Sequence, residues 1–248
     1  MFMLLVTICA NAQNLVPNGD FETYTTCPTT ASQVTLAPPW RQYHVATSDY
    51  LNGCAATTVS VPANLFGYQH AASGNAYMGG YAYTSTGFPD SYTEYITAPI
   101  TPMLIGTTYE VSMSVNRSNN SQSACNCLGI LFYDNGPTAT LTGTSGTVTS
   151  LVPQVSYASY GILADTQNWV RVTQYFTADS AYDNIVIGKF MPGSSMSFTG
   201  TGAAYYYYDS VVVKAASGIN NLYTDSMICA GDTFVVPYTL NNSALFTS

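Results

Sequence analysis

The chain has 248 residues, which is enough for one large domain or two small ones with a sizeable buried core. Only 7% of the residues are charged, with 5 Lys and Arg against 13 Asp and Glu, and the formal net charge is −8. This charge would repel a phosphate backbone or an anionic membrane surface, which excludes nucleic acid as a partner. Carboxylates are good ligands for divalent cations, so the same balance predicts a calcium site.

The first residues form a short apolar run, 1–12, that ends in Ala10-Asn11-Ala12. Small residues at this spacing are typical of a signal-peptide cleavage site, and the run is too short to span a bilayer. Segment 1–12 is therefore predicted to be a signal peptide. The mature protein is expected to be secreted or on the outer cell surface, with no membrane insertion after cleavage. The alternative is that this segment is the first buried strand of the domain.

Strand-like runs recur between clusters of Gly, Pro, Asn and Ser, and no window of helix length shows helical periodicity. The clearest run is 107–116, where apolar and polar residues alternate, so one face is expected in the core and the other in water. Two antiparallel sheets packed face to face would bury such strands, which predicts an all-β β-sandwich with Greek-key or jelly-roll connections. The other predicted strands are 76–83, 92–98, 128–133, 169–176, 184–190 and 205–214.

Two stretches interrupt this pattern. Residues 134–150 are rich in Thr, Gly and Ser and predict a flexible surface loop or a ragged hairpin. Small residues at 215–218 follow the last strong strand and predict a boundary. The expected organisation is a signal peptide at 1–12, the jelly-roll domain at 13–215, and a linker with the start of another domain at 216–248.

Three segments resemble, in the right order, the galactose-binding-like jelly rolls that include carbohydrate-binding modules of families 4 and 22. They are Asn-Leu-Val-Pro-Asn-Gly-Asp-Phe-Glu at 14–22, Ser-Gly-Asn-Ala-Tyr-Met at 73–78 and Tyr-Tyr-Tyr-Asp-Ser-Val-Val-Val at 206–213. The overall layout, with Cys27-Pro28 and Trp40, is similar to a domain of Bacteroidetes surface proteins that are gliding-motility-associated or adhesin-like. Residues 228–238 resemble the opening strands of immunoglobulin-like adhesin repeats, so 216–248 is expected to hold a truncated start of such a repeat.

In the resembling modules, the first and last strands lie side by side and hold a structural Ca²⁺ together with the loop before the second segment. The resemblance implies that the ligands here are the Asp20 and Ala76 carbonyls and the Glu22 and Asp209 carboxylates. Ser73 stands where those modules often place an acid, which lowers the negative charge of the site. In the alternative, the two acids are ordinary turn or edge residues.

Sugar binding requires exposed aromatic rings against the apolar faces of pyranoses, with Asn, Gln or acids that hydrogen-bond the hydroxyls. A single ring in a strand is more often a core residue, and the tyrosines at 205–208 must face both sides of their sheet, so some of them are expected to be buried. The predicted binding residues for a polysaccharide or cell-surface glycan are Gln69, Tyr81, Tyr92, Trp169 and Tyr206.

Six cysteines are present, and one would leave with the signal peptide. Cys27 and Cys54 flank one loop-rich stretch and are predicted to form a disulfide in an oxidising compartment. Cys125 and Cys127 would point to the same face of a strand, which fits a second disulfide, two free thiols or half of a zinc site. Their pairing, and that of Cys229, stays open.

Catalysis would require a nucleophile with a base, a pair of poised carboxylates or an open metal site. His44 and His70 lie outside any recognisable motif, and the only glutamates are Glu22, Glu94 and Glu110. The chain is therefore predicted not to be an enzyme but a non-catalytic extracellular binding module, carbohydrate-binding, in a larger cell-surface protein. The alternative is a structural or adhesin module that binds no small molecule and only spaces neighbouring repeats.

Overall fold

Fourteen strands and two short 3-10 turns, η1 (Val34–Leu36) and η2 (Ala158–Tyr160), make up the regular structure of the described residues in the computed structural model. These residues are 13–84, 90–134, 146–148 and 151–216. The predicted signal peptide, most of the predicted loop at 134–150, Cys229 and the predicted immunoglobulin-like start lie outside them. Within the described ranges, no helix is long and apolar enough to cross a membrane.

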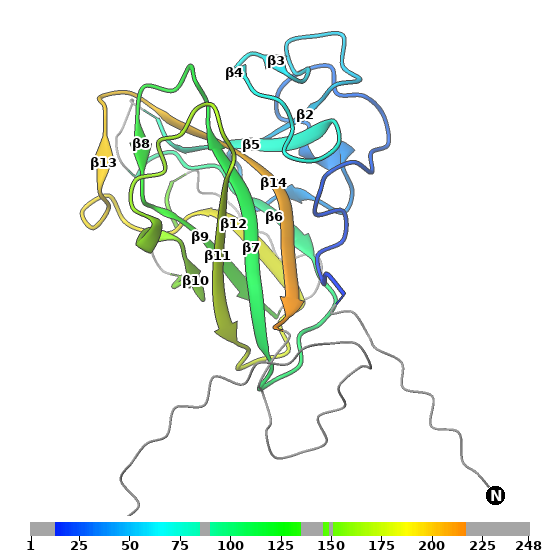
Figure 1. Cartoon of the computed structure of the whole chain (residues 1–248), viewed down its shortest axis with the longest axis vertical. Coiled ribbons are helices and arrows are strands. Elements are labelled where there is room, and N and C mark those ends of the chain that lie inside the picture. Colours follow the sequence, from blue (N-terminus) through cyan, green and yellow to red (C-terminus); the bar gives the residue numbers. More distant parts are fainter. Residues whose placement is uncertain (1–12, 85–89, 135–145, 149–150, 217–248) are drawn as a thin grey trace, which may run out of the picture. The chain divides into compact units, whose positions relative to one another are not determined.

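Two five-stranded antiparallel sheets contain ten of these strands (Figure 1). The front sheet has the order β11 (Val170–Thr177), β7 (Thr108–Arg117), β14 (Ala204–Ala215), β5 (Ala76–Tyr83) and β2 (Asp49–Asn52). The back sheet has the order β1 (Arg41–Gln42), β6 (Ile96–Pro99), β12 (Asn184–Lys189), β9 (Leu128–Tyr133) and β10 (Val155–Ser156). Two small pairs complete the fold: β13 (Phe198–Thr199) with β8 (Ala124–Cys125), and β3 (Ala63–Asn64) with β4 (Gly67–Tyr68).

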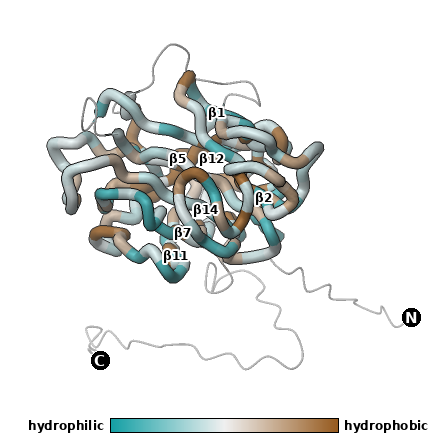
Figure 2. Tube along the Cα trace, turned by 90° about the horizontal axis from the view of Figure 1, so that it is seen from above, coloured by the Kyte–Doolittle hydropathy of each residue, from teal (hydrophilic) through white to brown (hydrophobic). Residues whose placement is uncertain are grey.

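The core lies between the two sheets, where inward-pointing residues of the longer strands pack together. Seen from above, hydrophobic stretches of the chain gather near β5 and β12 in the middle of the domain (Figure 2). The chain is thus an all-β jelly-roll β-sandwich of two antiparallel sheets, which confirms the predicted fold class. The inward side chains include Val111, Met113, Val115, Tyr206 and Tyr208 of the front sheet and Ile130, Phe132, Ile185 and Ile187 of the back sheet.

Six of the seven predicted strands begin and end within one residue of the observed ones. The exception is 92–98, because the chain changes sheets inside it. The amide of Glu94 donates to the carbonyl of Tyr81 in the front sheet, whereas Ile96 pairs with Gln42 and Ile187 in the back sheet. β6 therefore begins only at Ile96.

The segment 14–22 is not a regular strand, although it lies beside the last strand as the resemblance implies. Its Leu15 amide donates to the Val213 carbonyl at 2.7 Å, and the Val211 amide donates to the Gly19 carbonyl at 2.8 Å. A turn then follows, in which Phe21 has a positive φ of 60°, and this turn prevents a continuous ladder.

The outer face of the front sheet is largely covered, so the expectation that the polar face of 107–116 lies in water is wrong. Ser112, Ser114 and Asn116 of β7 are all buried. The Arg171 guanidinium donates to the Ser112 hydroxyl at 2.6 Å. Over the upper part of the face lies a second apolar cluster, to which residues 53–72 contribute Ala55, Val59, Val61, Phe66 and Ala71. We call residues 53–72 the cover segment.

All four described cysteines are in disulfides. Cys27 is bonded to Cys54, the predicted pair, with 5.7 Å between their Cα atoms. Cys125 is bonded to Cys127, with 5.4 Å between their Cα atoms. Sulfur atoms in a disulfide are not thiolate ligands, so this second bond argues against half of a zinc site. Two disulfides are typical of proteins in oxidising compartments.

Candidate functional site

A continuous row of aromatic rings crosses the outer face of the front sheet. It arises because alternate positions of β5 and β14 point to that face and carry aromatic residues. The centroid distances along the row are 6.5 Å for Tyr92 to Tyr81, 4.8 Å for Tyr81 to Tyr205, 5.6 Å for Tyr205 to Tyr207, 4.9 Å for Tyr207 to Tyr77 and 5.6 Å for Tyr77 to Trp169. Three residues predicted to bind glycan, Tyr81, Tyr92 and Trp169, thus belong to one surface feature.

The middle of this aromatic row is closed by the cover segment. The side chain of Asn64 accepts a hydrogen bond from the Tyr207 hydroxyl and donates one to the Tyr77 hydroxyl, both at 2.9 Å. The ring of Phe66 stacks on Tyr205, with centroids 4.1 Å apart and planes 7° apart. Tyr77, Tyr205 and Tyr207 are consequently almost fully buried. A ligand can reach the row only at its ends.

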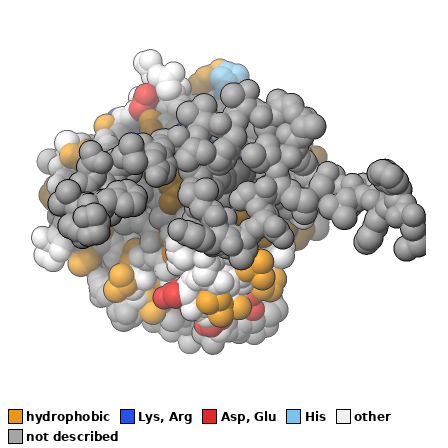
Figure 3. Space-filling model, turned by 60° about the horizontal axis from the view of Figure 1, so that its bottom comes forward, with side chains coloured by type: hydrophobic (Ala, Val, Ile, Leu, Met, Phe, Trp, Pro, Cys, Tyr) orange, Lys and Arg blue, Asp and Glu red, His pale blue; other side chains and the backbone are white. Residues whose placement is uncertain are grey.

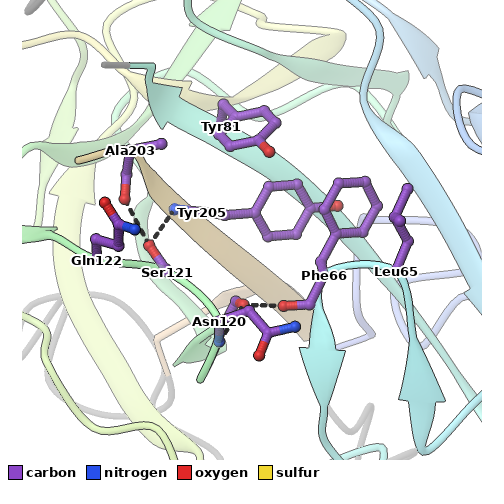
Figure 4. Close-up of a pocket in the computed structure, with 9 residues that line it drawn as sticks. Leu65, Phe66, Tyr81, Asn120, Ser121, Gln122, Ala203 and Tyr205 are labelled. Atoms are coloured by element: carbon purple, nitrogen blue, oxygen red, sulfur yellow. Dashed lines mark hydrogen bonds between the residues drawn. The ribbon is translucent and has the colours of Figure 1, made fainter.

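A pocket of about 270 Å³ lies beside Tyr81 and Tyr205, near the end of the row that Tyr92 occupies (Figure 4). Tyr81 and the Phe66–Tyr205 stack form one part of its wall, and the loop after β7 forms the other (Figure 4). The hydroxyl of Ser121 donates to the Ala203 carbonyl at 2.8 Å and accepts from the Tyr205 amide at 3.0 Å, which holds this loop on β14. The lining residues are Leu65, Phe66, Tyr81, Ser118, Asn120, Ser121, Gln122, Ala203 and Tyr205.

The pocket combines apolar rings with polar groups that have no partner. Asn120 and Gln122 are exposed, and Tyr81 is partly exposed. Within the described part of the chain, no hydrogen bond involves the two side-chain amides or the Tyr81 hydroxyl, so each can donate to or accept from a ligand. None of the nine lining residues is Asp, Glu, Lys or Arg. Rings beside amides suit a ligand with both apolar faces and hydroxyl groups.

Two buried carboxyl groups support this pocket from behind. Asp49 accepts a hydrogen bond from the Tyr205 hydroxyl at 2.7 Å. Glu94 accepts from the Tyr81 amide at 2.8 Å and from the Tyr92 hydroxyl at 2.9 Å. Neither carboxyl group forms an ion pair within the described residues. These hydrogen bonds hold Tyr205, Tyr81 and Tyr92 of the aromatic row in place. The two carboxyl groups lower the stability of the folded state when they are ionised, because buried charges without counter-charges are unfavourable.

The pKa values of these two carboxyl groups reflect this effect. Burial, and after it the charge of Asp49, raises the pKa of Glu94 to about 8. Burial also raises the pKa of Asp49 to about 6, against the opposing hydrogen bonds from Tyr205 and Ser32. Glu94 therefore keeps its proton at neutral pH, while Asp49 is largely ionised.

Four of the five predicted calcium ligands meet at one turn. The Asp209 carboxylate accepts hydrogen bonds from the Ala72 and Ser73 amides at 2.8 and 2.9 Å. The Glu22 carboxylate accepts from the Asn75 and Ala76 amides, both at 2.7 Å. Two acids on one turn suit a cation, but these N–H donors already compensate much of their charge. In the described part of the chain, no group of three or more His, Cys, Asp or Glu residues is placed to hold a metal.

Two further details define this turn. Gly74 has a φ of +59°, and a Cβ there would lie 2.3 Å from the Glu22 carboxyl carbon, so the turn requires glycine. Burial raises the pKa of Asp209 to about 6, although the backbone hydrogen bonds from Ser73 and Ser210 oppose the shift. Asp20, the fifth predicted ligand, is exposed, and its carboxylate accepts from the Glu22 amide at 3.5 Å.

Tyr206 and Gln69 are not placed to bind a ligand, contrary to the prediction. Tyr206 is fully buried in the core, and its hydroxyl donates to the Leu163 carbonyl at 3.0 Å. Val211 is buried and points into the core, so strict alternation along β14 would place Tyr206 on the outer face. A bulge at Asp209–Val212 shifts the alternation, and Tyr206 therefore points into the core. Gln69 is only 6% exposed and donates to a backbone carbonyl.

Trp169 and Tyr92 are partly exposed members of the row that lie outside the pocket lining. The Trp169 indole N–H donates to the His70 carbonyl at 2.8 Å. Sequence reasoning missed the pocket residues Phe66, Asn120 and Gln122. They come from two loops that meet only in the folded chain, so no local pattern points to them.

No protein-family model and no curated protein matches the chain. Among solved structures, it is similar to a putative sugar binding protein from Bacteroides thetaiotaomicron, at 13% identity and a TM-score of 0.41, over 82% of this chain and 100% of that one. It is also similar to the CBM22-1 xylan-binding domain from Paenibacillus barcinonensis, at 12% identity and a TM-score of 0.39, over 86% and 100% of the two chains.

A third similar structure is the enzymatically active domain of tailspike protein 4 from bacteriophage CBA120, at 12% identity and a TM-score of 0.38. That alignment covers 82% of this chain, which spans only 21% of the tailspike chain. Identities and TM-scores this low assign no function, so the geometry of the site must carry the functional argument.

Proposed function

We propose that the chain is a non-catalytic, extracellular carbohydrate-binding module that holds a glycan in the pocket between Tyr81, Phe66 and the loop after β7. The observation that carries this proposal is the pairing of a partly exposed tyrosine ring with the exposed side-chain amides of Asn120 and Gln122, which form no hydrogen bond with any described residue. A pyranose has an apolar face that packs on a ring and hydroxyl groups that bond to amides. The two disulfides support a location outside the cell, either secreted or on the cell surface.

A glycan array probed with the full chain tests this proposal. Wild type should give saturable binding to one glycan class, and Tyr81→Ala should weaken it about fivefold, because a lost stacking contact is worth about 1 kcal/mol. Tyr175→Ala is the matched control, since Tyr175 is 61% exposed on the same sheet but does not line the pocket. Absence of binding by folded wild type, or equal losses in both variants, would contradict the proposal.

The alternative function is a structural or adhesin module that binds no small molecule. It is favoured by the burial of Tyr77, Tyr205 and Tyr207, whose rings act as a second core under the cover segment. This function predicts that folded protein binds nothing on the array.

We also propose a structural Ca²⁺ at the turn held by Glu22 and Asp209, where the ion would link the N-terminal segment to the last strand. The support is the convergence of two carboxylates on residues 72–76. The melting temperature should then rise with Ca²⁺ over EDTA in wild type but not in a Glu22→Ala, Asp209→Ala double variant. A melting temperature that is the same in Ca²⁺ and EDTA would mean that the amide donors alone stabilise these acids.

A further inference from the structure

The cover segment closes the sheet face beside the pocket, so the site differs from a binding groove that runs openly across a sheet, and this difference limits the kinds of ligand that fit. Resting on the glycan-binding function proposed above, we infer that the pocket takes the terminal sugar of an uncharged glycan and does not hold an internal stretch of a polysaccharide. Three observations lead to this inference: the fixed cover over the sheet face, the small volume of the pocket and its uncharged lining.

The cover segment blocks the path that an extended chain would take across the sheet. It is fixed at its β3–β4 hairpin, because Asn64 bonds to the hydroxyls of Tyr77 and Tyr207. The Ser118 hydroxyl also donates to the Phe66 carbonyl, and the Tyr68 amide donates to the Asn119 side chain at 3.0 Å. Hydrogen bonds from both the sheet and the neighbouring loop therefore hold the cover closed. A sugar packed on Tyr81 would lie against the stacked rings of Phe66 and Tyr205. These rings would prevent a polysaccharide chain from continuing along the aromatic row.

The volume of the pocket fits a short ligand. At about 270 Å³, it lies just below the range of roughly 300–1,000 Å³ that is usual for sites of drug-sized molecules. A site of this size holds one or two sugar units. The amides of Asn120 and Gln122 lie opposite the rings and can bond to the hydroxyl groups of a unit that enters end-on (Figure 4).

The charge distribution selects a neutral sugar. No lining residue is basic, and Arg117, which precedes the pocket loop, donates to the carbonyls of Ala164 and Ser121. The largely ionised Asp49 carboxyl group lies behind Tyr205, and the whole chain carries a net charge of −8. At the end of the domain away from β3 and β4, which Figure 3 brings forward, the visible side chains are mostly uncharged, with acidic ones among them. A uronic acid or a sulfated sugar would therefore meet repulsion with no counter-charge in the pocket.

The test is a titration of the full chain with neutral gluco-, galacto-, manno- and xylo-oligosaccharides of about one to six units, alongside galacturonic-acid oligomers of the same lengths. We expect the affinity for the neutral series that binds to level off by two units, with less than about a twofold change up to six. Chemical blocking of the terminal unit should abolish binding, and the uronic-acid oligomers should not bind.

The outcomes separate this inference from the function on which it rests. An affinity that rises about tenfold or more between two and six units, or that survives blocking of the chain end, would overturn end recognition while glycan binding stands. Binding of the uronic-acid oligomers would overturn the neutral-ligand part. A loss of affinity in Tyr175→Ala that is smaller than the loss in Tyr81→Ala would also count against end recognition, because Tyr175 pairs with Glu110 on the outer face and would contact only a longer chain. If no sugar binds at all, the glycan-binding function itself fails.

Discussion

Replacement of Glu94 with glutamine should make the protein more stable than wild type at alkaline pH and remove part of the pH dependence of its unfolding. Glu94 is 4% exposed, and its pKa is raised from 4.5 to about 8 by burial and by the charge of Asp49. This difference of about 3.5 pH units corresponds to about 5 kcal/mol, at about 1.36 kcal/mol per unit. Glutamine keeps an acceptor for the Tyr81 amide but carries no charge at any pH.

The sign of the effect follows from which state holds the proton. Below about pH 4.5, both the folded and the unfolded chain keep it, so Glu94 costs no stability. Between about pH 4.5 and 8, the unfolded chain releases the proton and the folded chain retains it, so the free energy of unfolding falls as the pH rises. Above about pH 8, both states are ionised and the loss is complete. Glu94→Gln should therefore match wild type near pH 4.5 and exceed it by about 3–5 kcal/mol near pH 9.

Urea denaturation followed by circular dichroism, at about pH 4.5, 7 and 9, measures this difference directly. Glu110→Gln is the control, because Glu110 is partly exposed on β7 and lies 3.3 Å from Lys214. The control should follow wild type across the pH range to within about 1 kcal/mol. If the free energies of unfolding of Glu94→Gln and wild type run parallel from about pH 4.5 to 9, the carboxyl pair does not destabilise the folded state and the reasoning is refuted.

Three further predictions concern stability. Replacement of both cysteines of the Cys27–Cys54 disulfide with serine should lower the free energy of unfolding by about 3.5 kcal/mol, as measured in urea, because the bond links residues 27 positions apart. Asn64→Ala should cost about 1–3 kcal/mol by the same measurement, since a buried tyrosine hydroxyl loses its acceptor; an unchanged value would mean that the cover is not held there. Gly74→Ala should lower the melting temperature more than Gly106→Ala. Both glycines have a positive φ, but only at position 74 would the added Cβ collide with a carboxyl group, that of Glu22; equal decreases in melting temperature would contradict this contact.

The strands were predictable because each carries its own local signal. In β7, the alternation of Val111, Met113 and Val115 with polar residues fixes both the strand and its inward face. In β14, alternation alone gives the wrong face for Tyr206, since the bulge at Asp209–Val212 shifts the pattern by one residue and Ser210 takes a φ of 52°. A bulge is set by pairing with neighbouring strands, which the sequence of β14 alone does not show.

The candidate site was less predictable because it depends on contacts between distant segments. Tyr81 could be named from its strand, but its partners Phe66 and Asn120 reach the pocket through loops. The covering of the sheet face depends on Asn64, one amide among several in a turn-rich stretch, whose role follows only from two tyrosine hydroxyls contributed by β5 and β14. The sequence therefore predicted a glycan ligand, whereas the pocket proposed to bind it follows only from the folded chain.

Binding of a neutral glycan in this pocket can be measured by isothermal titration of the best array ligand into the full chain and into an Asn120→Ala, Gln122→Ala double variant. Both side chains are exposed and form no hydrogen bonds of their own within the described residues, so the double variant should keep the melting temperature of wild type. The account predicts an affinity at least about tenfold weaker, since two hydrogen bonds to the ligand are lost. Equal affinities for wild type and the double variant would contradict it.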